Sequence, residues 1–352
     1  MDHSTLEFLK TMVNTPGPSG YEQQVQSVYR QYVKSYADTV TTDVLGSVIA
    51  AINPNSPFKV MLAGHADEIG FQIRYIADDG SLYFGQIGGH DGVVAVGQRV
   101  NVHTATGPIP GVLGRKAIHL LEAGERDKVP RTDDLWIDIG AVNGEEAKKV
   151  VSVGDCVTYA PQFEMLQGTR ATARSFDNKM GCVVIAEALR LLKDRKVQCG
   201  VYAVANVQEE IGLRGARTAT YAIAPTVGIA TDVCHAMDFP GADKKKVGDI
   251  KLGAGPVIAR GANINPRVFE LLVESARKLE IPYQIEALPA GTGTDANAMQ
   301  VTQGGIATGL ISVPLRYMHT PCEVMDLEDI TNAALLMAEF VASITAETNL
   351  IP

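Results

Sequence analysis

The chain has 352 residues, of which 46% are hydrophobic and 20% charged, and its formal net charge is -9. This length and apolar content predict a large core divided between two globular units, and they argue against disorder. A negative chain offers no large basic patch, so we expect neither nucleic acid nor an anionic membrane as a partner.

The N-terminal residues, the apolar runs and the cysteines bear on location. Residues 1–4 lack the basic segment and apolar stretch of a secretory signal. No run of about eighteen apolar residues predicts a membrane helix. The five cysteines are odd in number and never spaced Cys-x-x-Cys, which favours reduced thiols over disulfides or a zinc ribbon. We therefore expect a cytoplasmic protein.

The first predicted elements are a helix and two short strands. After a Pro- and Gly-rich break at residues 16–20, apolar residues follow helical spacing from Val25 to Tyr36. Residues 48–52 and 59–63 are typical of buried strands, and the second strand leads directly to His65.

From about residue 69 the sequence pattern changes. Short β-type runs at residues 71–76, 82–87, 99–104 and 135–139 are separated by turns rich in Gly, Asp and Pro. This pattern predicts a small β-rich domain that occupies residues 69–164.

After residue 174, apolar strands alternate again with longer helical patterns. The predicted helices cover residues 180–192 and 266–279, the predicted strands cover 201–207, 227–231 and 305–313, and Asp326 is expected to cap the last helix. Neither half of this pattern has enough strands for a covered sheet by itself. Residues 1–68 and 165–352 are therefore expected to form one α/β domain, with a mixed, largely parallel sheet covered by helices.

Ionisable side chains follow the predicted strands of this α/β domain. Ligands of open α/β sheets collect beyond the carboxyl ends of the strands. The candidate residues at these ends and at the start of the helix near residue 180 are His65, Asp177, Glu209, Glu210, Asp232 and His319. We expect them to converge on one rim of the sheet.

The residue types favour a two-metal hydrolytic site. Imidazole nitrogens and carboxylate oxygens hold Zn²⁺, with Co²⁺ or Mn²⁺ as substitutes, and leave a position open for water. Two histidines and three carboxylates supply three ligands to each of two ions if one aspartate bridges them at roughly 4 Å spacing. Asp177, a short side chain in a tight turn, is the expected bridge. Of the neighbours Glu209 and Glu210, one can bind an ion while the other accepts a proton from water.

Asp67 is expected to support the first ligand. In His65-Ala66-Asp67 the first and third side chains point the same way on an extended segment, so Asp67 can accept a hydrogen bond from the far nitrogen of His65.

Each residue also has a simpler explanation. A single histidine is more often structural, Asp177 and Asp232 could cap helices, and Glu209-Glu210 could be an acidic turn. Only the conjunction favours a metal site. A structural or terminal role is expected for His3, His90, His103 and His119, and His235 is at best a neighbour of the site. Residues 291–295 lack the remainder of a phosphate-binding loop and are expected to form a turn near the site.

Several long motifs occur in an order that resembles the M42 metallo-aminopeptidases, which include the TET peptidases and the glutamyl aminopeptidases. The matching segments are Gly64-His65-Ala66-Asp67-Glu68-Ile69-Gly70, Ser175-Phe176-Asp177-Asn178-Lys179, Gln208-Glu209-Glu210-Ile211-Gly212-Leu213-Arg214-Gly215-Ala216, Gly293-Thr294-Asp295-Ala296 and Arg316-Tyr317-Met318-His319-Thr320-Pro321. They extend over nearly the whole chain.

The resemblance implies roles for these residues. His65, Asp177 and Asp232 would bind one metal ion, Asp177, Glu210 and His319 would bind the other, and Glu209 would be the general base. The β-rich insert would be a PDZ-like dimerisation domain. Dimers would assemble into a tetrahedral dodecamer that admits peptides to an inner chamber. Cys234 and Met237, near Asp232, look unusual for the family, so the substrate preference stays open.

Three other functions are compatible with some of these residues. A glycosidase is disfavoured because the side chains of adjacent Glu209 and Glu210 should diverge, although some relatives carry cellulase labels. A deacylase or amidohydrolase with the same two metals is the stronger alternative. It is distinguished from an aminopeptidase by whether the substrate must carry a free α-amine. A non-enzymatic peptide-binding particle would lack at least one metal-ligating residue, and the sequence retains all five. The first-residue preference, the metal used and full assembly are not determined by the sequence.

Overall fold

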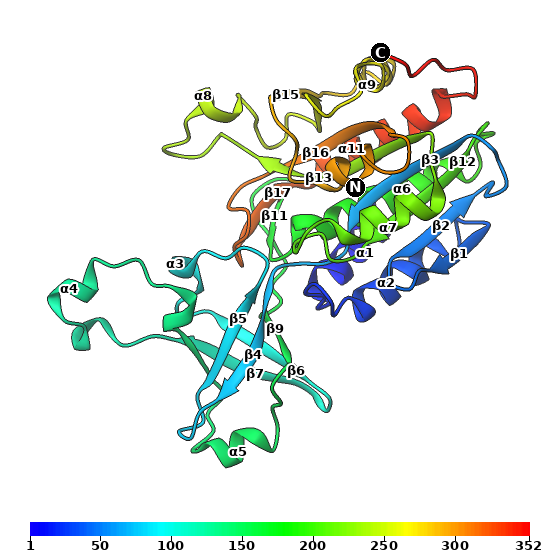
Figure 1. The fold of residues 1–352 in the computed structure, drawn as a ribbon. Coiled ribbons are helices and arrows are strands. Elements are labelled where there is room, and N and C mark those ends of the chain that lie inside the picture. The colour runs from blue at the N-terminus through cyan, green and yellow to red at the C-terminus, as the bar shows by residue number, and fades with distance from the viewer.

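A computed structural model describes the backbone of residues 1–352 and every side chain apart from that of Ala123. The chain forms two parts, an α/β part that contains both termini and a β-rich part that projects from it (Figure 1).

The α/β part is built on an eight-stranded mixed sheet. Parallel pairing joins β12 to β3, β3 to β13, and β13 to β16, and antiparallel strands continue the sheet on both sides of this centre. The central strands are apolar along nearly their whole length because both faces of the sheet are covered. In spatial order the strands are β1 (Thr39–Thr42), β2 (Val48–Ile52), β12 (Gly200–Asn206), β3 (Lys59–His65), β13 (Val227–His235), β16 (Ala307–Leu315), β14 (Val257–Gly261) and β15 (Gln284–Leu288).

Helices cover the two faces of this sheet. On one face the core includes Val60 and Leu62, and the helices packed there are α1 (His3–Asn14), α2 (Gln23–Val33), α6 (Phe176–Leu192), α9 (Pro266–Lys278) and α11 (Leu327–Ser343). On the other face the core includes Met61 and Ala63, packed against α7 (Arg214–Ile223) and α10 (Asp295–Gln300). Alternate residues of β3 therefore supply two separate cores.

The β-rich part is a closed barrel of six strands. Its interior is filled by side chains such as Phe71, Ile73, Leu113 and Ile137, all nearly fully buried. Around the barrel the strands are β4 (Gly70–Ile76), β5 (Leu82–Ile87), β8 (Trp136–Asp138), β7 (Gly107–Gly114), β6 (Arg99–Thr104) and β9 (Cys156–Tyr159). Short helices α3 (Gly92–Ala95), α4 (Ala123–Arg126) and α5 (Gly144–Lys148) lie in its connections.

A separate three-stranded sheet joins two strands that follow the barrel to one strand near the C-terminus, and the latter carries Glu323, which is described below. This sheet pairs β10 (Glu164–Met165) with β11 (Arg170–Ala173), and β11 with β17 (Glu323–Asp326). A further short helix, α8 (Lys244–Val247), follows β13. Among the described residues, no helix combines the length and apolar character needed to cross a lipid bilayer.

Most predicted elements are present, with shifted ends. The helix expected from residue 180 begins at Phe176, but Asp177 and Asn178 have non-helical backbone angles, so its regular part starts where expected. The strand expected to end at residue 231 continues to His235, because it pairs with β16 along nine residues. Asp326 accepts a hydrogen bond from the Glu328 amide, which confirms the predicted N-cap.

Candidate metal centre

The parallel centre of the sheet brings the candidate residues together. Because β12, β3 and β13 are adjacent and parallel, their carboxyl ends lie at one edge of the sheet. His65 is the last residue of β3, Glu209 and Glu210 follow β12, and Asp232 lies on the extended β13. The topology therefore brings His65 beside residues that lie more than a hundred positions later in the chain.

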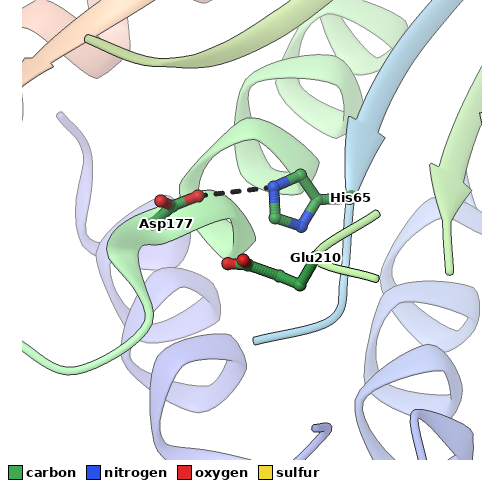
Figure 2. Close-up of side chains that lie close together, drawn as sticks. All are labelled: His65, Asp177 and Glu210. Carbon is green, nitrogen blue, oxygen red and sulfur yellow. Dashed lines mark ion pairs between the residues drawn. The ribbon is translucent and has the colours of Figure 1, made fainter. Parts of the chain in front are cut away.

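His65 is the centre of one group of candidate ligands. Its Nε2 atom lies 3.3 Å from Asp177 Oδ1, 3.7 Å from Glu209 Oε2 and 3.9 Å from Asp232 Oδ1. The imidazole is 1% exposed, so these carboxylates meet it in a nearly dry environment. Figure 2 shows His65 and Asp177 facing one another, with Glu210 beside them.

His319 is the centre of a second group. Its Nε2 atom lies 3.4 Å from Asp177 Oδ2 and 3.6 Å from Glu210 Oε2, and its side chain is 37% exposed. The Nδ1–H of His319 donates to the carbonyl of Gly89, 3.0 Å away, in the segment between β5 and α3. The barrel part thus helps to orient a residue of the site.

Asp177 joins the two groups. Its two carboxylate oxygens face different histidines, the geometry that a bridging carboxylate needs. Burial raises the pKa of Asp177, but hydrogen bonding to His319 and His65 outweighs it, and the pKa lies below its ordinary value. The predicted bridge thus remains the carboxylate best placed for that role.

Asp67 contacts both His65 and the turn that carries Glu209 and Glu210. The Nδ1–H of His65 donates to the main-chain carbonyl of Asp67 at 3.1 Å, whereas the carboxylate Oδ1 lies at 3.4 Å. That carboxylate accepts hydrogen bonds from the amides of Glu209 (3.0 Å) and Glu210 (3.1 Å) and from the Ser19 hydroxyl (2.6 Å). Asp67 therefore fixes the turn that carries both glutamates, as well as the histidine.

Glu323 supports the second group and was missed by sequence reasoning. Its side chain is 2% exposed, and its two carboxylate oxygens accept hydrogen bonds from the amides of Asp177 and His319, each at 3.1 Å. Burial, followed by the charge of Asp177, raises its pKa well above the ordinary value. The available signal was its position four residues after His319.

A buried cluster of charged side chains supports the loop that contains Asp177. Glu68 accepts hydrogen bonds from Lys179 Nζ at 2.6 Å, from the guanidinium of Arg174 and from the Gly17 amide at 2.9 Å. Lys179 also donates to the carbonyl of Thr15 at 2.6 Å. Because all three charged side chains are buried, they stay paired and tie the loop after His65 to the loop that contains Asp177.

The donor set fits divalent metal ions. Oxygen and nitrogen atoms of His65, Asp177 and Glu210 lie within 4.8 Å of one another, and so do those of His65, Glu209 and Asp232. Burial is the main cause that raises the pKa of Asp232 and of Glu210 to about 8, with Asp177 adding to both. Buried carboxylates with such high pKa values lack enough positive charge around them, and cations would supply it. Each Nδ1 is already bonded to a carbonyl, which leaves Nε2 free to ligate.

A cavity of about 550 Å³ opens onto this centre. Besides the candidate ligands, it is lined by the turn at residues 292–294, by Asn297 of α10, and by residues of β13, β15 and β16. The turn predicted near the site from Gly291 to Asp295 is therefore at its edge. Asp295 itself is buried and accepts a hydrogen bond from Asn206 at 2.7 Å.

His90 and His103 make contacts within the barrel part. His90 Nε2 lies 2.8 Å from the Gly70 carbonyl and its ring stacks on Phe71, and burial lowers its pKa to about 4. His103 bonds Thr158 within the barrel, and the exposed His235 lines the cavity without joining either group. The cysteines are all free thiols, and only Cys322 is exposed.

The family model that describes M42 glutamyl aminopeptidases matches residues 46–336 of this chain. This match extends over most of both parts of the fold. The chain belongs to the M42 peptidase family.

Relatives of this M42 peptidase are similar to it along nearly their whole length. A lysyl aminopeptidase of Pyrococcus furiosus is 40% identical over 333 residues, covering 94% of each chain. The structure of a TET aminopeptidase from a marine sediment Thaumarchaeota archaeon has a TM-score of 0.93 and 34% identity, covering 98% of this chain and 97% of its own. The TET1 peptidase of Pyrococcus horikoshii has a TM-score of 0.86 and 31% identity, covering 97% and 100%.

These likenesses identify the class of reaction. The M42 peptidase described here is a hydrolase of peptide bonds, and aminopeptidase is the activity named for its relatives. M42 peptidases depend on metal, and the two groups around His65 and His319 are where this chain offers ligands.

Proposed function

We propose that this protein removes N-terminal residues from peptides with the help of two divalent metal ions. His65, Asp177 and Asp232 would hold one ion, and Asp177, Glu210 and His319 would hold the other. The observation that carries this proposal is Asp177, whose two oxygens face the two histidines separately. Zn²⁺ fits the mixed nitrogen and oxygen donors, with Co²⁺ or Mn²⁺ as substitutes.

Glu209 is proposed as the general base. When bound, the ions would acidify a water molecule and polarise the peptide carbonyl. Glu209 accepts the proton of the attacking water and then delivers it to the leaving amine. Burial is the largest cause that raises the pKa of Glu209 to about 10, followed among the raising effects by Asp232 and Asp295. Nearby cations would lower this pKa toward the working range of a base.

The carboxylates around His65 also permit a second assignment of the metal ligand and the general base. Glu209 lies as close to His65 as Asp232 does, so either carboxylate could complete the ligands of the buried ion. We assign the base to Glu209 because its backbone is fixed by Asp67 at the turn after β12, whereas Asp232 projects from the interior of β13.

The proposal extends to the domains and the assembly of the chain. Residues 1–68 and 165–352 would form the catalytic unit, and residues 69–164 a PDZ-like dimerisation unit, which in this structure is a closed six-stranded barrel. The Pyrococcus horikoshii relative can assemble into a tetrahedron or a large octahedral shell. We propose a dodecamer for this chain, and its mass in solution tests that proposal. The cytoplasmic location stays a prediction.

One experiment separates the aminopeptidase from the alternative deacylase. Purified protein loaded with Zn²⁺ is assayed on aminoacyl coumarin amides with a free α-amine and on the same amides after N-acetylation. We expect hydrolysis of the free substrates only, its loss with chelator, and two ions per chain by elemental analysis. Hydrolysis of the acetylated substrates would favour the deacylase, and activity that survives complete metal removal would overturn the proposed centre.

A further inference from the structure

The cavity beside the metal centre contains one carboxylate that the proposed mechanism does not use. Glu286, on β15, lines this cavity, and its side chain is 8% exposed. Burial raises its pKa, and among the described residues no neighbouring cation opposes that shift. The lining of the cavity includes no lysine or arginine from the described part of the chain.

The sheet determines where Glu286 lies relative to the metal ligands. Asp232 of β13 pairs with Ser312 of β16, Ser312 pairs with Val257 of β14, and on the next strand Glu286 pairs with Ala259. Alternate residues share a face, so Asp232 and Glu286 project from the same face of the sheet. Three strand spacings and an offset of two residues along the strand separate them, which is about 16 Å between backbones.

This separation suits a long substrate side chain. The bond to be cut lies beside the metal ligands, so the first residue of the peptide must point from there into the cavity. A fully extended lysine side chain reaches roughly 6 Å from its Cα, and the side chains of Asp232 and Glu286 occupy part of the remaining span. Leu288 and Leu310 provide apolar walls for the methylene groups of such a chain.

We propose that Glu286 selects peptides whose first residue carries a cationic side chain, lysine or arginine. The inference rests on the proposed function, because it requires the N-terminal residue to occupy this cavity. A cation supplies the partner that Glu286 lacks, and the buried setting strengthens the pair. A neutral side chain leaves the carboxylate unpaired, and an acidic one adds like charge, so glutamyl substrates are expected to be the poorest.

The test compares substrates that differ in charge and little in shape. With the Zn²⁺-loaded protein, kcat/KM is measured for lysyl, norleucyl and glutamyl coumarin amides, since norleucine resembles lysine without its ammonium group. We expect lysyl to exceed norleucyl by about 10- to 100-fold, and Glu286→Gln to bring that ratio close to one. Glu274→Gln, at an exposed position of α9, should leave the ratio unchanged.

A binding measurement keeps the inference testable without turnover. L-lysinamide and L-norleucinamide are titrated calorimetrically into the Glu209→Gln variant, and tighter binding of lysinamide is expected. A wild-type ratio near or below one, or a ratio that persists in Glu286→Gln, overturns the role of Glu286. Failure of every free-amine substrate, norleucyl included, would instead overturn the proposed function. If Glu286→Gln does not fold, the wild-type comparison of lysyl with norleucyl still decides.

Discussion

The two groups of candidate metal ligands around Asp177 differ in how deeply they lie. His65 is 1% exposed and is enclosed by the loops of Asp67 and Asp177, whereas the side chain of His319 is 37% exposed and its orientation depends on the carbonyl of Gly89 from the barrel part. Burial and rigid support favour tight metal binding, and exposure favours exchange. We therefore expect a firmly held ion at the His65 position and a more labile ion at the His319 position.

The largest expected effect concerns Glu209, which lies at the buried position. Glu209→Gln should lower kcat by about 10³-fold, since it removes the base and keeps the shape. Elemental analysis should still find two ions per chain, and Glu274→Gln should behave like wild type. If the variant instead loses an ion, Glu209 is a ligand of the buried position and the base must be sought elsewhere.

Replacement of each histidine tests directly whether the two positions bind their ions with different affinity. His319→Ala should retain the buried ion, giving one per chain, while His65→Ala should also lose stability because it empties a fully buried site. Both variants should lose at least about 100-fold in activity, since each removes a proposed metal ligand. His119→Ala, in an exposed short helix, is the control. Equal affinity for both ions in a chelator titration of the wild type would contradict the comparison.

Glu323 provides a test of the more exposed metal position, which is the one at His319. It holds the amides of Asp177 and His319, and Glu323→Gln would turn a donor toward one of them. We expect the affinity of the weaker ion to fall by about 10- to 100-fold. Competition with a fluorescent chelator measures this, and the exposed Glu328→Gln serves as the control. An unchanged affinity would mean that Glu323 merely caps the loop.

The smallest expected effect is a pH dependence of the folding stability, caused by the buried residue Glu22. Glu22 is 3% exposed, and burial, with the charge of Asp67 second, raises its pKa from an ordinary 4.5 to about 7. A carboxyl group whose folded-state pKa is raised costs stability as the pH rises from about 4.5 to about 7. Glu22→Gln keeps the oxygen that accepts from the Gly20 and Gln208 amides, so it should stabilise the metal-loaded protein by about 2 kcal/mol at pH 8 and by little at pH 4.5.

Denaturant unfolding at the two pH values measures this difference. Glu274→Gln is the control, because an exposed glutamate gives no such dependence. The same gain at both pH values would show that the raised pKa is not its cause.

Much of the fold could be predicted because its signals are local. The apolar run before His65 needed only its own residues to be a buried strand, and Asp326 needed only its helix to be a cap. Strands β14 and β15 were not predicted, since β15 alternates buried and exposed residues at the sheet edge and is a short, ambiguous run. Glu286 was missed with it. Glu323 was missed because its partners are amides that the chain brings to it only on folding.

The sequence by itself determined which residue types are available, which strands are buried, and which ionisable groups stand beside them, because these depend on neighbours along the chain. It also carried the motifs from which the family was inferred. Only the tertiary structure decided that the two oxygens of Asp177 face different histidines, that Asp67 bonds the amides of Glu209 and Glu210, and that a barrel carbonyl orients His319. These are contacts between distant segments that only folding brings together, and the parallel pairing of β12 with β3 places His65 beside the turn that carries Glu209 and Glu210.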